Sequence, residues 1–434
     1  MRPRSVVALV HSSLTLAAAP AQALPDLTPF SAAGATAGCS VAGTVKGYEV
    51  EPSLAADPTG EVVAAAWQQD RNTNYGGGSA ANAVAVSTDH GVHWRRSIVE
   101  GVSACGGGAS ARISDPWVAV DPEGTVYVAS EAVEPDAVVV QSSRDGGATW
   151  TSVQVAEEGD KETMAVDPET PGRAWVGWNS GLEFSVSRTD DYGATWSAPT
   201  SFGNGNVGQG FDIHLLPLTG GRLVAVESDG QSGGYNNFAL VARSSDDAGR
   251  TWSPRSRLGI FRSLSLYTPE GQGFRADAVI FSAASAGNHA WVAVQGARRV
   301  AVFHSGDGGM TWRRRPLAKR GALVGTPTIA VSPDARKVVV SYLSLDRDRS
   351  GDRAVTARWR TLRSGDGGTT FRDTPLTRTF DARPAKTDGT IFLGDYTGLT
   401  ALGYAGDFAA LVVATHPLAR AGLTDPLLAR FHVG

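Results

Sequence analysis

The sequence predicts an all-β protein, a seven-bladed β-propeller of four-stranded blades. Near-copies of one motif, Ser/Thr-x-Asp-x-Gly-x-Thr-Trp, occur six times in 434 residues, and their aspartates lie 46 to 60 residues apart. This period suits one four-stranded blade with variable loops. No long segment shows helical periodicity. First strands of blades are expected near Glu51, Asp115, Glu162, Gly210, Arg275, Thr326 and Gly394. Six blades are the alternative, if one pair of strands is an insertion.

Each blade is expected to begin with two apolar strands joined by an Asp-Pro or Ser-Pro turn, as at Asp57-Pro58 and Ser332-Pro333. Proline fixes such a turn and cannot continue the hydrogen-bonded ladder. The third strand is an alternating or apolar run before the motif, as in residues 137–140, and a short polar strand follows it, as in residues 150–155.

The repeated motif has the chemistry of a hairpin turn. An aspartate carboxylate can accept backbone N–H groups ahead of it, and the glycine accommodates a positive φ angle. The closing aromatic residue can fill the base of a blade. We therefore assign a structural role to the six motif aspartates, Asp89, Asp145, Asp191, Asp247, Asp307 and Asp366.

The end of the chain suggests how the ring closes. The last group, residues 394–434, holds three strands and stops where its own motif would begin. We expect residues 41–50 to supply the missing outer strand. Cys39 leads into that segment and Cys105 lies in the first blade, so a disulfide is expected between them in an exported chain. Two free, buried cysteines are the alternative.

The N-terminus resembles a cleaved secretory signal, with Arg2 and Arg4, a mostly apolar run and the triplet Ala21-Gln22-Ala23. We expect a signal peptide at 1–23, an N-terminal segment with the closing strand at 24–50, and the propeller at 51–434. The mature protein should be secreted. No later run of eighteen apolar residues predicts a membrane span, and a net charge of −4 argues against a nucleic-acid partner.

The repeated motif is identified as the Asp box, or BNR repeat, and the chain resembles the bacterial sialidase superfamily over most of residues 51–434. The resemblance implies a glycan or glycoconjugate partner and an exo-glycosidase activity. It also implies three arginines that clamp a substrate carboxylate, a tyrosine nucleophile with a glutamate partner, and an aspartate as acid/base. A planar guanidinium grips a carboxylate bidentately, and tyrosine nucleophiles are the sialidase exception among glycosidases.

Three positions match the family's catalytic context. Arg71 resembles its second arginine, Arg298 its third, and Tyr396 in Tyr-Thr-Gly-Leu its nucleophile, although Tyr396 falls one blade later than a six-bladed order requires. The first arginine motif is replaced by Glu51-Pro52-Ser53, which reverses the charge. The segment Arg112-Ile-Ser-Asp115-Pro resembles a displaced version of that motif, and the alternative is that Arg112 is a surface or salt-bridge residue.

The family's other carboxylates have no clear counterpart here. No aspartate follows Arg71 in the loop where the acid/base would stand, and Glu227 is the nearest guess for the glutamate partner of the nucleophile. The catalytic set implied by the resemblance is therefore incomplete.

Charged residues also mark the starts of the expected inner strands. Because these strands run parallel around the channel, their starts gather at one mouth. The carboxylates there are Glu51, Asp115, Glu162, Asp212, Asp277 and Asp395, and their candidate partners are Arg71, Arg112, Lys161 and Arg275. Crowded carboxylates require neutralisation by protons, arginines or a cation. This arrangement predicts either a ligand site at the mouth or a set of salt bridges that hold the blades together.

No cofactor is expected apart from calcium. Asp346, Asp348, Ser350 and Asp352 imitate the start of a calcium loop, but Ala357 stands where the bidentate carboxylate is needed. Three functions stay open for a chain that we expect to be monomeric. These are a sialidase-like glycosidase, a non-catalytic module that binds a glycan or protein, and a structural scaffold.

Overall fold

The computed structural model describes residues 23–32, 34–74, 77–181, 183–203, 210–230, 237–262, 266–267, 273–276, 279–296, 298–317, 323–346, 355–387, 389–419 and 422–434. Residues 1–22, nearly all of the expected signal peptide, lie outside this set. The described chain is built of strands and three short 3-10 helices, Ala104–Gly106, Thr219–Gly221 and Arg383–Ala385. In this part of the chain no helix has the length and apolar character needed to cross a membrane.

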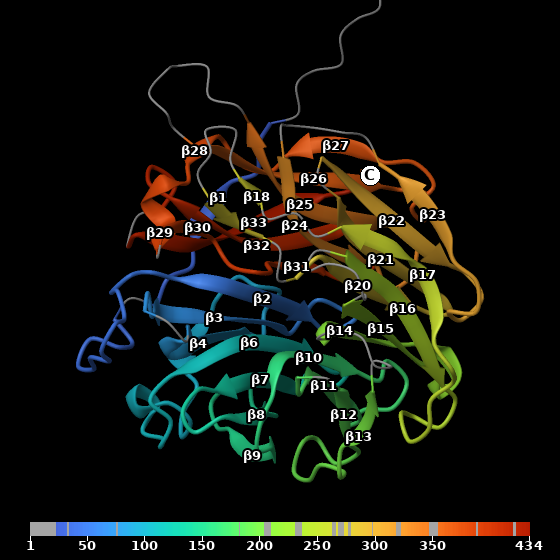
Figure 1. Cartoon of the computed structure of the whole chain (residues 1–434), viewed down its shortest axis with the longest axis horizontal. Helices are drawn as coiled ribbons and strands as arrows, with labels where there is room; N and C mark the ends of the chain where they lie inside the picture. The colour runs from blue at the N-terminus through green and yellow to red at the C-terminus, as the bar shows by residue number, and fades with distance from the viewer. Residues whose placement is uncertain are drawn as a thin grey trace, which may run out of the picture.

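Most strands form groups of four, in which each strand pairs antiparallel with the next along the chain (Figure 1). The first two groups are β2 (Val50–Ala56), β3 (Val63–Arg71), β4 (Ser79–Ser87) and β5 (Arg95–Ile98), then β6 (Ile113–Val120), β7 (Val126–Ala132), β8 (Ala137–Ser143) and β9 (Thr151–Ala156). The next two are β10 (Asp160–Val166), β11 (Ala174–Asn179), β12 (Glu183–Thr189) and β13 (Thr200–Gly203), then β14 (Gly210–Pro217), β15 (Leu223–Gly230), β16 (Asn237–Ser245) and β17 (Ser256–Arg262).

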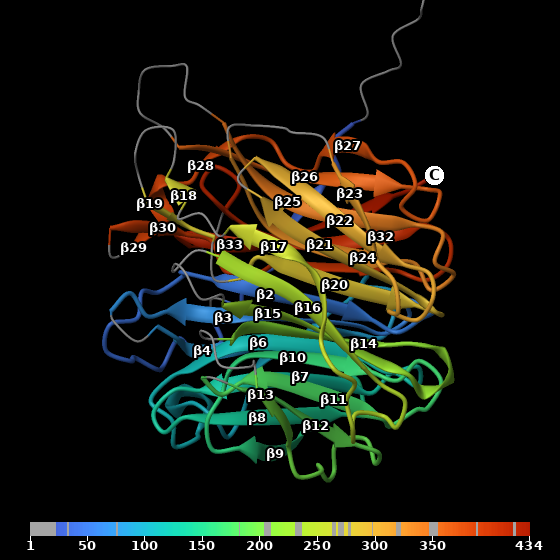
Figure 2. The ribbon, with the colours of Figure 1, turned by 45° about the vertical axis from the view of Figure 1, so that its right-hand side comes forward.

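The second half of the chain continues this pattern, as a turned view shows (Figure 2). One group is β20 (Phe281–Ala286), β21 (His289–Gly296), β22 (Arg299–Ser305) and β23 (Arg313–Pro316), and another is β24 (Leu323–Val331), β25 (Val338–Asp346), β26 (Thr356–Ser364) and β27 (Arg372–Pro375). The last consists of β31 (Gly398–Ala401), β32 (Asp407–Thr415), β33 (Thr424–His432) and the N-terminal β1 (Leu27–Pro29).

The first strands of these groups form a closed ring. β2 contacts β6, and the contacts continue in turn through β10, β14, β20 and β24 to β31, which contacts β2 again. Each first strand thus has a neighbour on both sides, as blades around a central axis require. The all-β propeller fold predicted from the repeat is confirmed.

One expected blade start was misplaced. Arg275 does not open a blade: it ends β19 (Gly273–Arg275), and the blade strand β20 begins at Phe281. β19 belongs to a small sheet with β18 (Leu266–Tyr267), β29 (Lys386–Thr387) and β30 (Thr390–Phe392). β19 pairs in parallel with β30 and sets Arg275 opposite Phe392. Another short strand, β28 (Phe380–Asp381), pairs with β26.

Tryptophans pack at the junctions between neighbouring blades and form hydrogen bonds across them. Trp175, Trp291 and Trp359 are each 1% exposed and lie on second or third strands. Their indole N–H groups donate to carbonyl oxygens of the next blade, at Ala248, Gly367 and Val413, over 3.0, 3.4 and 2.7 Å. A large apolar body with one satisfied polar atom suits such a junction.

The motif aspartates are turn residues, as predicted. In every copy the carboxylate accepts the backbone N–H of the residue four positions on, at 2.8 or 2.9 Å, and the hydroxyl of the preceding Ser or Thr. Hydrogen bonds to Thr149 and Ser143 lower the pKa of Asp145 to about 2. The motif glycines all have positive φ, between 76° and 88°.

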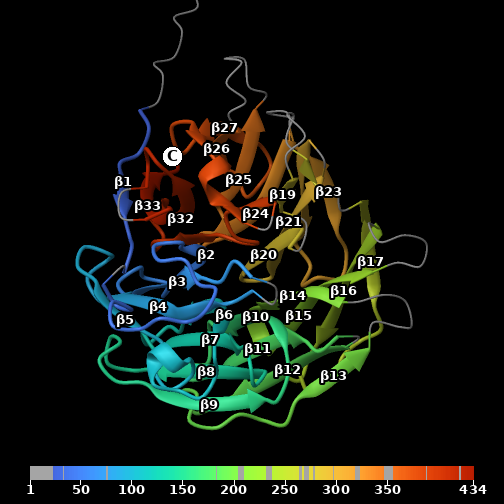
Figure 3. The same ribbon diagram turned by 60° about the vertical axis from the view of Figure 1, so that its left-hand side comes forward.

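The N-terminal segment closes the ring, but residues 41–50 do not supply the outer strand. That strand is β1, whose Thr28 lies opposite Leu428 of β33 (Figure 3). Pro29 is tolerated there because an edge strand has one side without a partner. Residues 41–49 contain Gly43 and Gly47, both at positive φ, and form turns with isolated bridges, and Val50 begins β2.

These turns still link the two ends of the ring. Thr44 bridges to Asn72 beside the first blade, and Tyr48 bridges to Thr424 in the last.

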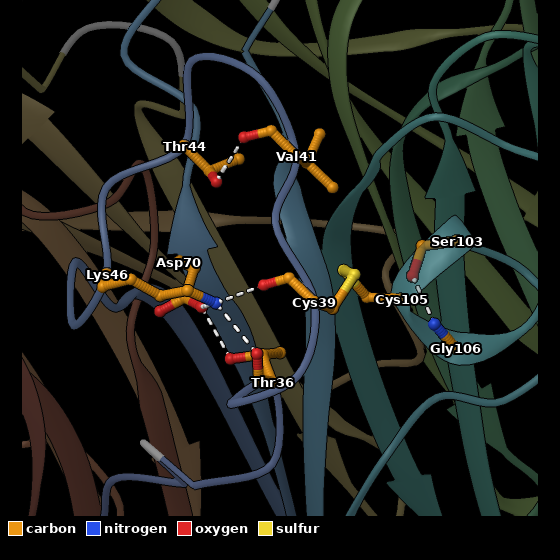
Figure 4. Close-up of a disulfide and its surroundings, with 9 residues drawn as sticks. All are labelled: Thr36, Cys39, Val41, Thr44, Lys46, Asp70, Ser103, Cys105 and Gly106. Carbon is orange, nitrogen blue, oxygen red and sulfur yellow. Dashed lines mark hydrogen bonds and ion pairs between the residues drawn. A yellow bond between two sulfur atoms is a disulfide. The ribbon is translucent and has the colours of Figure 1, made fainter.

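The predicted disulfide between Cys39 and Cys105 is present, with Cα atoms 5.6 Å apart (Figure 4). Beside it, the Lys46 ammonium donates to the carbonyl oxygens of Thr36 and Cys39 and to the Asp70 carboxylate, over 2.9, 2.7 and 2.8 Å. The disulfide and this network tie the N-terminal segment to the first blade.

Candidate functional site

Backbone bulges shape one mouth of the ring. In β2, β6, β10 and β24 the register shifts near the start of the strand. At each shift a residue other than glycine has a positive φ: Glu51 (54°), Asp115 (43°), Lys161 (59°) and Thr326 (51°). Such residues rarely adopt this conformation, and bulges of this kind re-aim side chains. Because the same strained position recurs in four blades, we interpret it as a regular part of the blade architecture.

Three of these four residues line one cavity of about 520 Å³, which we call the mouth pocket. Its lining residues are Glu51, Arg71, Asn72, Asn74, Gly77, Gly78, Ser114, Asp115, Glu131, Asp160, Lys161, Arg275, Thr390 and Phe392. The pocket therefore combines residues from the first three blades with residues from the small sheet.

Ion pairs cross the floor of the pocket. The Lys161 ammonium lies 2.8 Å from Asp115, 3.4 Å from Asp160 and 3.5 Å from Asp395. Arg275 makes a two-point contact with Asp395, with its Nε 3.0 Å from Oδ1. These pairs join β10 to β6 and the start of the last blade to the small sheet.

Glu51 and Arg71 form the remaining pair. Arg71 Nη1 lies 3.4 Å from Glu51 Oε2, and Gln68 donates to the same carboxylate. The guanidinium groups of Arg71 and Arg275 both lie over the Phe392 ring, 4.3 and 4.6 Å from its centre. Phe392 thus holds two cations side by side.

The carboxyl groups of the mouth differ in acidity. Burial, reinforced by the Asp115 charge, raises the pKa of Glu51 to about 8. Burial would also raise the pKa of Asp115, but the Lys161 ammonium lowers it below its ordinary value. In the same way, Arg275 and Lys161 overcome burial and lower the pKa of Asp395. A protonated glutamic acid therefore lies beside ionised aspartates at neutral pH.

The structure does not bring the sialidase-like catalytic set together. Arg71 lines the mouth pocket, but Arg298 is exposed in the loop between β21 and β22 and Tyr396 is not part of the lining. The Tyr396 side chain is 6% exposed, and its hydroxyl donates to the carbonyl oxygen of Pro116 at 3.3 Å. Burial and nearby carboxylates raise its pKa well above the ordinary value. Glu227, the guess for its partner, pairs with Arg243 at 2.9 Å.

Other predicted ligand residues lie behind the pocket. Arg112 donates to the Gly77 carbonyl and contacts Glu134 at 2.8 Å, so it supports the loop that rims the cavity. Glu162 is 1% exposed and does not line the pocket. Asp212 follows a register shift in β14, lies 3.3 Å from His214 and does not line the pocket.

Two further predictions fall partly outside the described residues. Asp277 of the carboxylate ring lies outside them. Of the expected calcium loop, Asp346 ends β25, and Asp348, Ser350 and Asp352 lie outside. The calcium prediction for that loop therefore stays a prediction.

Sequence reasoning missed several residues of the pocket, among them Asp160, Glu131 and Phe392. Asp160 precedes Lys161 directly and could have been found from the charged run Asp160-Lys161-Glu162. Glu131 is the second-to-last residue of β7, one strand away from the expected mouth, and the pairing of Ser114 with Glu131 brings it to the pocket. Phe392 has no local signal because the small sheet that carries it joins segments more than 110 residues apart.

The model of the BNR repeat-like domain family matches residues 43–258. The chain is a BNR-repeat protein. The recognition made from the repeated motif is thereby confirmed at the level of the repeat family. The BNR repeat-like domain contains Glu51, Asp115 and Lys161, whereas Arg275 and Phe392 of the mouth pocket lie beyond the matched residues.

Several solved structures are similar to this BNR-repeat chain. A protein of unknown function from Dyadobacter fermentans is 15% identical, with a TM-score of 0.48 over 90% of this chain and 96% of its own. A Hadza microbial sialidase is 16% identical, with a TM-score of 0.46 over 76% of this chain and 66% of its own. An α-L-arabinanase of Penicillium chrysogenum is 13% identical, with a TM-score of 0.45 over 74% and 93%. No curated protein matches the sequence.

Proposed function

We propose that this chain is a secreted, monomeric, glycan-binding propeller whose ligand occupies the mouth pocket. The observation that carries the proposal is a cavity of about 520 Å³ in which charged and amide side chains converge. Such cavities, with a few placed polar groups, are the usual form of small-ligand sites. Export agrees with the disulfide, because disulfides persist in oxidising compartments. The domain division into residues 1–23, 24–50 and 51–434 is part of this proposal.

Binding without hydrolysis is favoured over a sialidase mechanism. The tyrosine that resembles the family's nucleophile is buried, and its hydroxyl is engaged by Pro116. Arg298 does not reach the pocket that Arg71 lines. Arg71 and Arg275 already contact Glu51 and Asp395, so a substrate carboxylate would have to displace these partners.

A second candidate function is glycoside hydrolysis with different catalytic residues. Glu51 has the raised pKa that a general acid needs, and Asp115 is held ionised by Lys161 in the same cavity. A pair of carboxyls with separated pKa values is the arrangement that glycosidases use. In this alternative Glu51 donates a proton to the leaving oxygen.

The test is a glycan panel followed by an assay with 4-nitrophenyl glycosides. Glu51→Gln is compared with Glu183→Gln, since Glu183 is exposed at the start of β12. Glycan binding that Glu51→Gln weakens and Glu183→Gln retains supports the site. Release of nitrophenol that Glu51→Gln abolishes establishes hydrolysis. Failure to bind any glycan, or equal binding by both variants, contradicts the proposal.

A further inference from the structure

A group of carboxylates at the edge of the mouth pocket has the geometry of a cation site. Asp115 of β6, Glu131 of β7 and Asp160 of β10 can each present one oxygen, and these oxygens lie within 4.8 Å of one another. They come from the second and third blades, so the group spans a junction between blades.

The cations of the mouth do not balance these carboxylates. Lys161 contacts Asp115 and Asp160, at 2.8 and 3.4 Å. The guanidinium groups of Arg71 and Arg275 are directed to Glu51 and Asp395 instead. Glu131 has no ion pair with a described residue. Among the described residues, the Lys161 ammonium is thus the one cation in direct contact with these three carboxylates.

Glu162 provides an independent sign of a missing partner. Its side chain is 1% exposed, and among the described residues neither carboxylate oxygen has a hydrogen-bond partner. Burial, followed by the charges of Glu131, Asp115 and Asp160, raises the pKa of the Glu162 carboxyl well above its ordinary value, so this carboxyl lies near the group. A buried carboxylate without a hydrogen bond is costly unless it is neutralised or coordinates a metal.

We propose that Asp115, Glu131, Asp160 and Glu162 bind a calcium ion at this junction. The four groups offer oxygen ligands alone, which suit a hard cation. Calcium accepts six to eight oxygens in irregular geometry, whereas magnesium demands a near-ideal octahedron. Water from the adjoining pocket supplies the remaining ligands. The ion neutralises the excess charge that Lys161 leaves, and it ties β6 and β7 to β10. This proposal does not rest on glycan binding.

The experiment is titration of EDTA-treated, full-length protein with calcium chloride, followed by calorimetry and by thermal unfolding. We expect saturable binding with a Kd of about 10⁻⁴–10⁻³ M, the range of extracellular calcium modules, and a rise in melting temperature. Glu131→Gln and Asp160→Asn should each abolish both effects. Both variants should fold without calcium, because each removes a repelling charge.

Asp346→Asn is the matched control, because Asp346 belongs to the other candidate calcium loop and lies outside this group. Calcium binding retained in Asp346→Asn and lost in Glu131→Gln supports the proposal. Absence of a calcium effect in the unaltered chain overturns it, as does a calcium effect that survives in both Glu131→Gln and Asp160→Asn. Because no glycan is present, failure here leaves the proposed glycan function untouched.

Discussion

The Lys161 ammonium lies 2.8 Å from the Asp115 carboxylate, and both residues occupy the left-handed bulge position of their strands. The side chains are 12% and 3% exposed, so water screens the pair weakly. The same backbone irregularity, repeated in adjacent blades, thus creates an ion pair between them.

Removal of one partner from this pair should destabilise the propeller strongly. Lys161→Met leaves Asp115 buried without its cation, which typically costs about 3–5 kcal/mol of unfolding free energy. Urea unfolding measures the loss. The double variant Lys161→Met, Asp115→Asn should lose much less, since it leaves no charge without a partner. A double variant as unstable as Lys161→Met would show that packing, rather than charge, dominates.

Glu49 should make stability fall as the pH rises. Burial raises the pKa of this carboxyl from 4.5 to about 8 in the fold, against the effect of its Ser31 and Gln69 hydrogen bonds. The folded state therefore holds a proton that the unfolded state loses first. The stabilisation that Glu49 contributes is fully present below pH 4.5 and is lost as the pH rises to about 8. The free energy of unfolding falls by at most about 1.4 kcal/mol per pH unit from this group.

Glu49→Gln cannot ionise and should flatten this part of the stability profile, which urea unfolding at a series of pH values measures. The exposed Glu61 provides the control. Glu61→Gln should leave the slope unchanged, and an unchanged slope in Glu49→Gln would refute the assignment.

Deletion of the closing strand should promote aggregation. A chain that lacks residues 24–29 loses β1 and exposes the edge of β33 from Leu427 to Ala429. Exposed edges pair with other chains. Light scattering during gentle heating should rise earlier than in the full chain. Deletion of residues 41–43, which belong to no strand, should have a weaker effect, and the opposite order would contradict the closure seen here.

An aspartate of the repeated turn should affect stability but not ligand binding. Asp307→Ala removes acceptors from the Thr311 N–H, the Thr311 hydroxyl and the Ser305 hydroxyl. Loss of a comparable helix cap costs about 1 kcal/mol. Thermal unfolding should show this loss, while the glycan affinity of the remaining folded protein stays unchanged. Weakened binding at unaltered stability would mean that the turn has a direct role.

The sequence by itself determined the features that depend on local chemistry. The blades were predicted from six turns, each of which needs an aspartate acceptor and a glycine at positive φ. This was possible because each turn is complete within eight residues. The disulfide followed from two cysteines in an exported chain whose ends must meet. Glu51, Asp115 and Asp395 were placed at one mouth because parallel inner strands begin on the same side.

Tertiary structure alone decided the features that depend on contacts between distant segments. β1 closes the ring in place of residues 41–50, because the last edge accepts whichever segment reaches it in register. Arg275 left its expected blade because β19 pairs with β30. Tyr396 became a buried hydrogen-bond donor because the fold places Pro116 against its hydroxyl. The direction of a side chain depends on strand bulges and on contacts with residues of neighbouring blades. The short motifs that identify the fold contain no information about either.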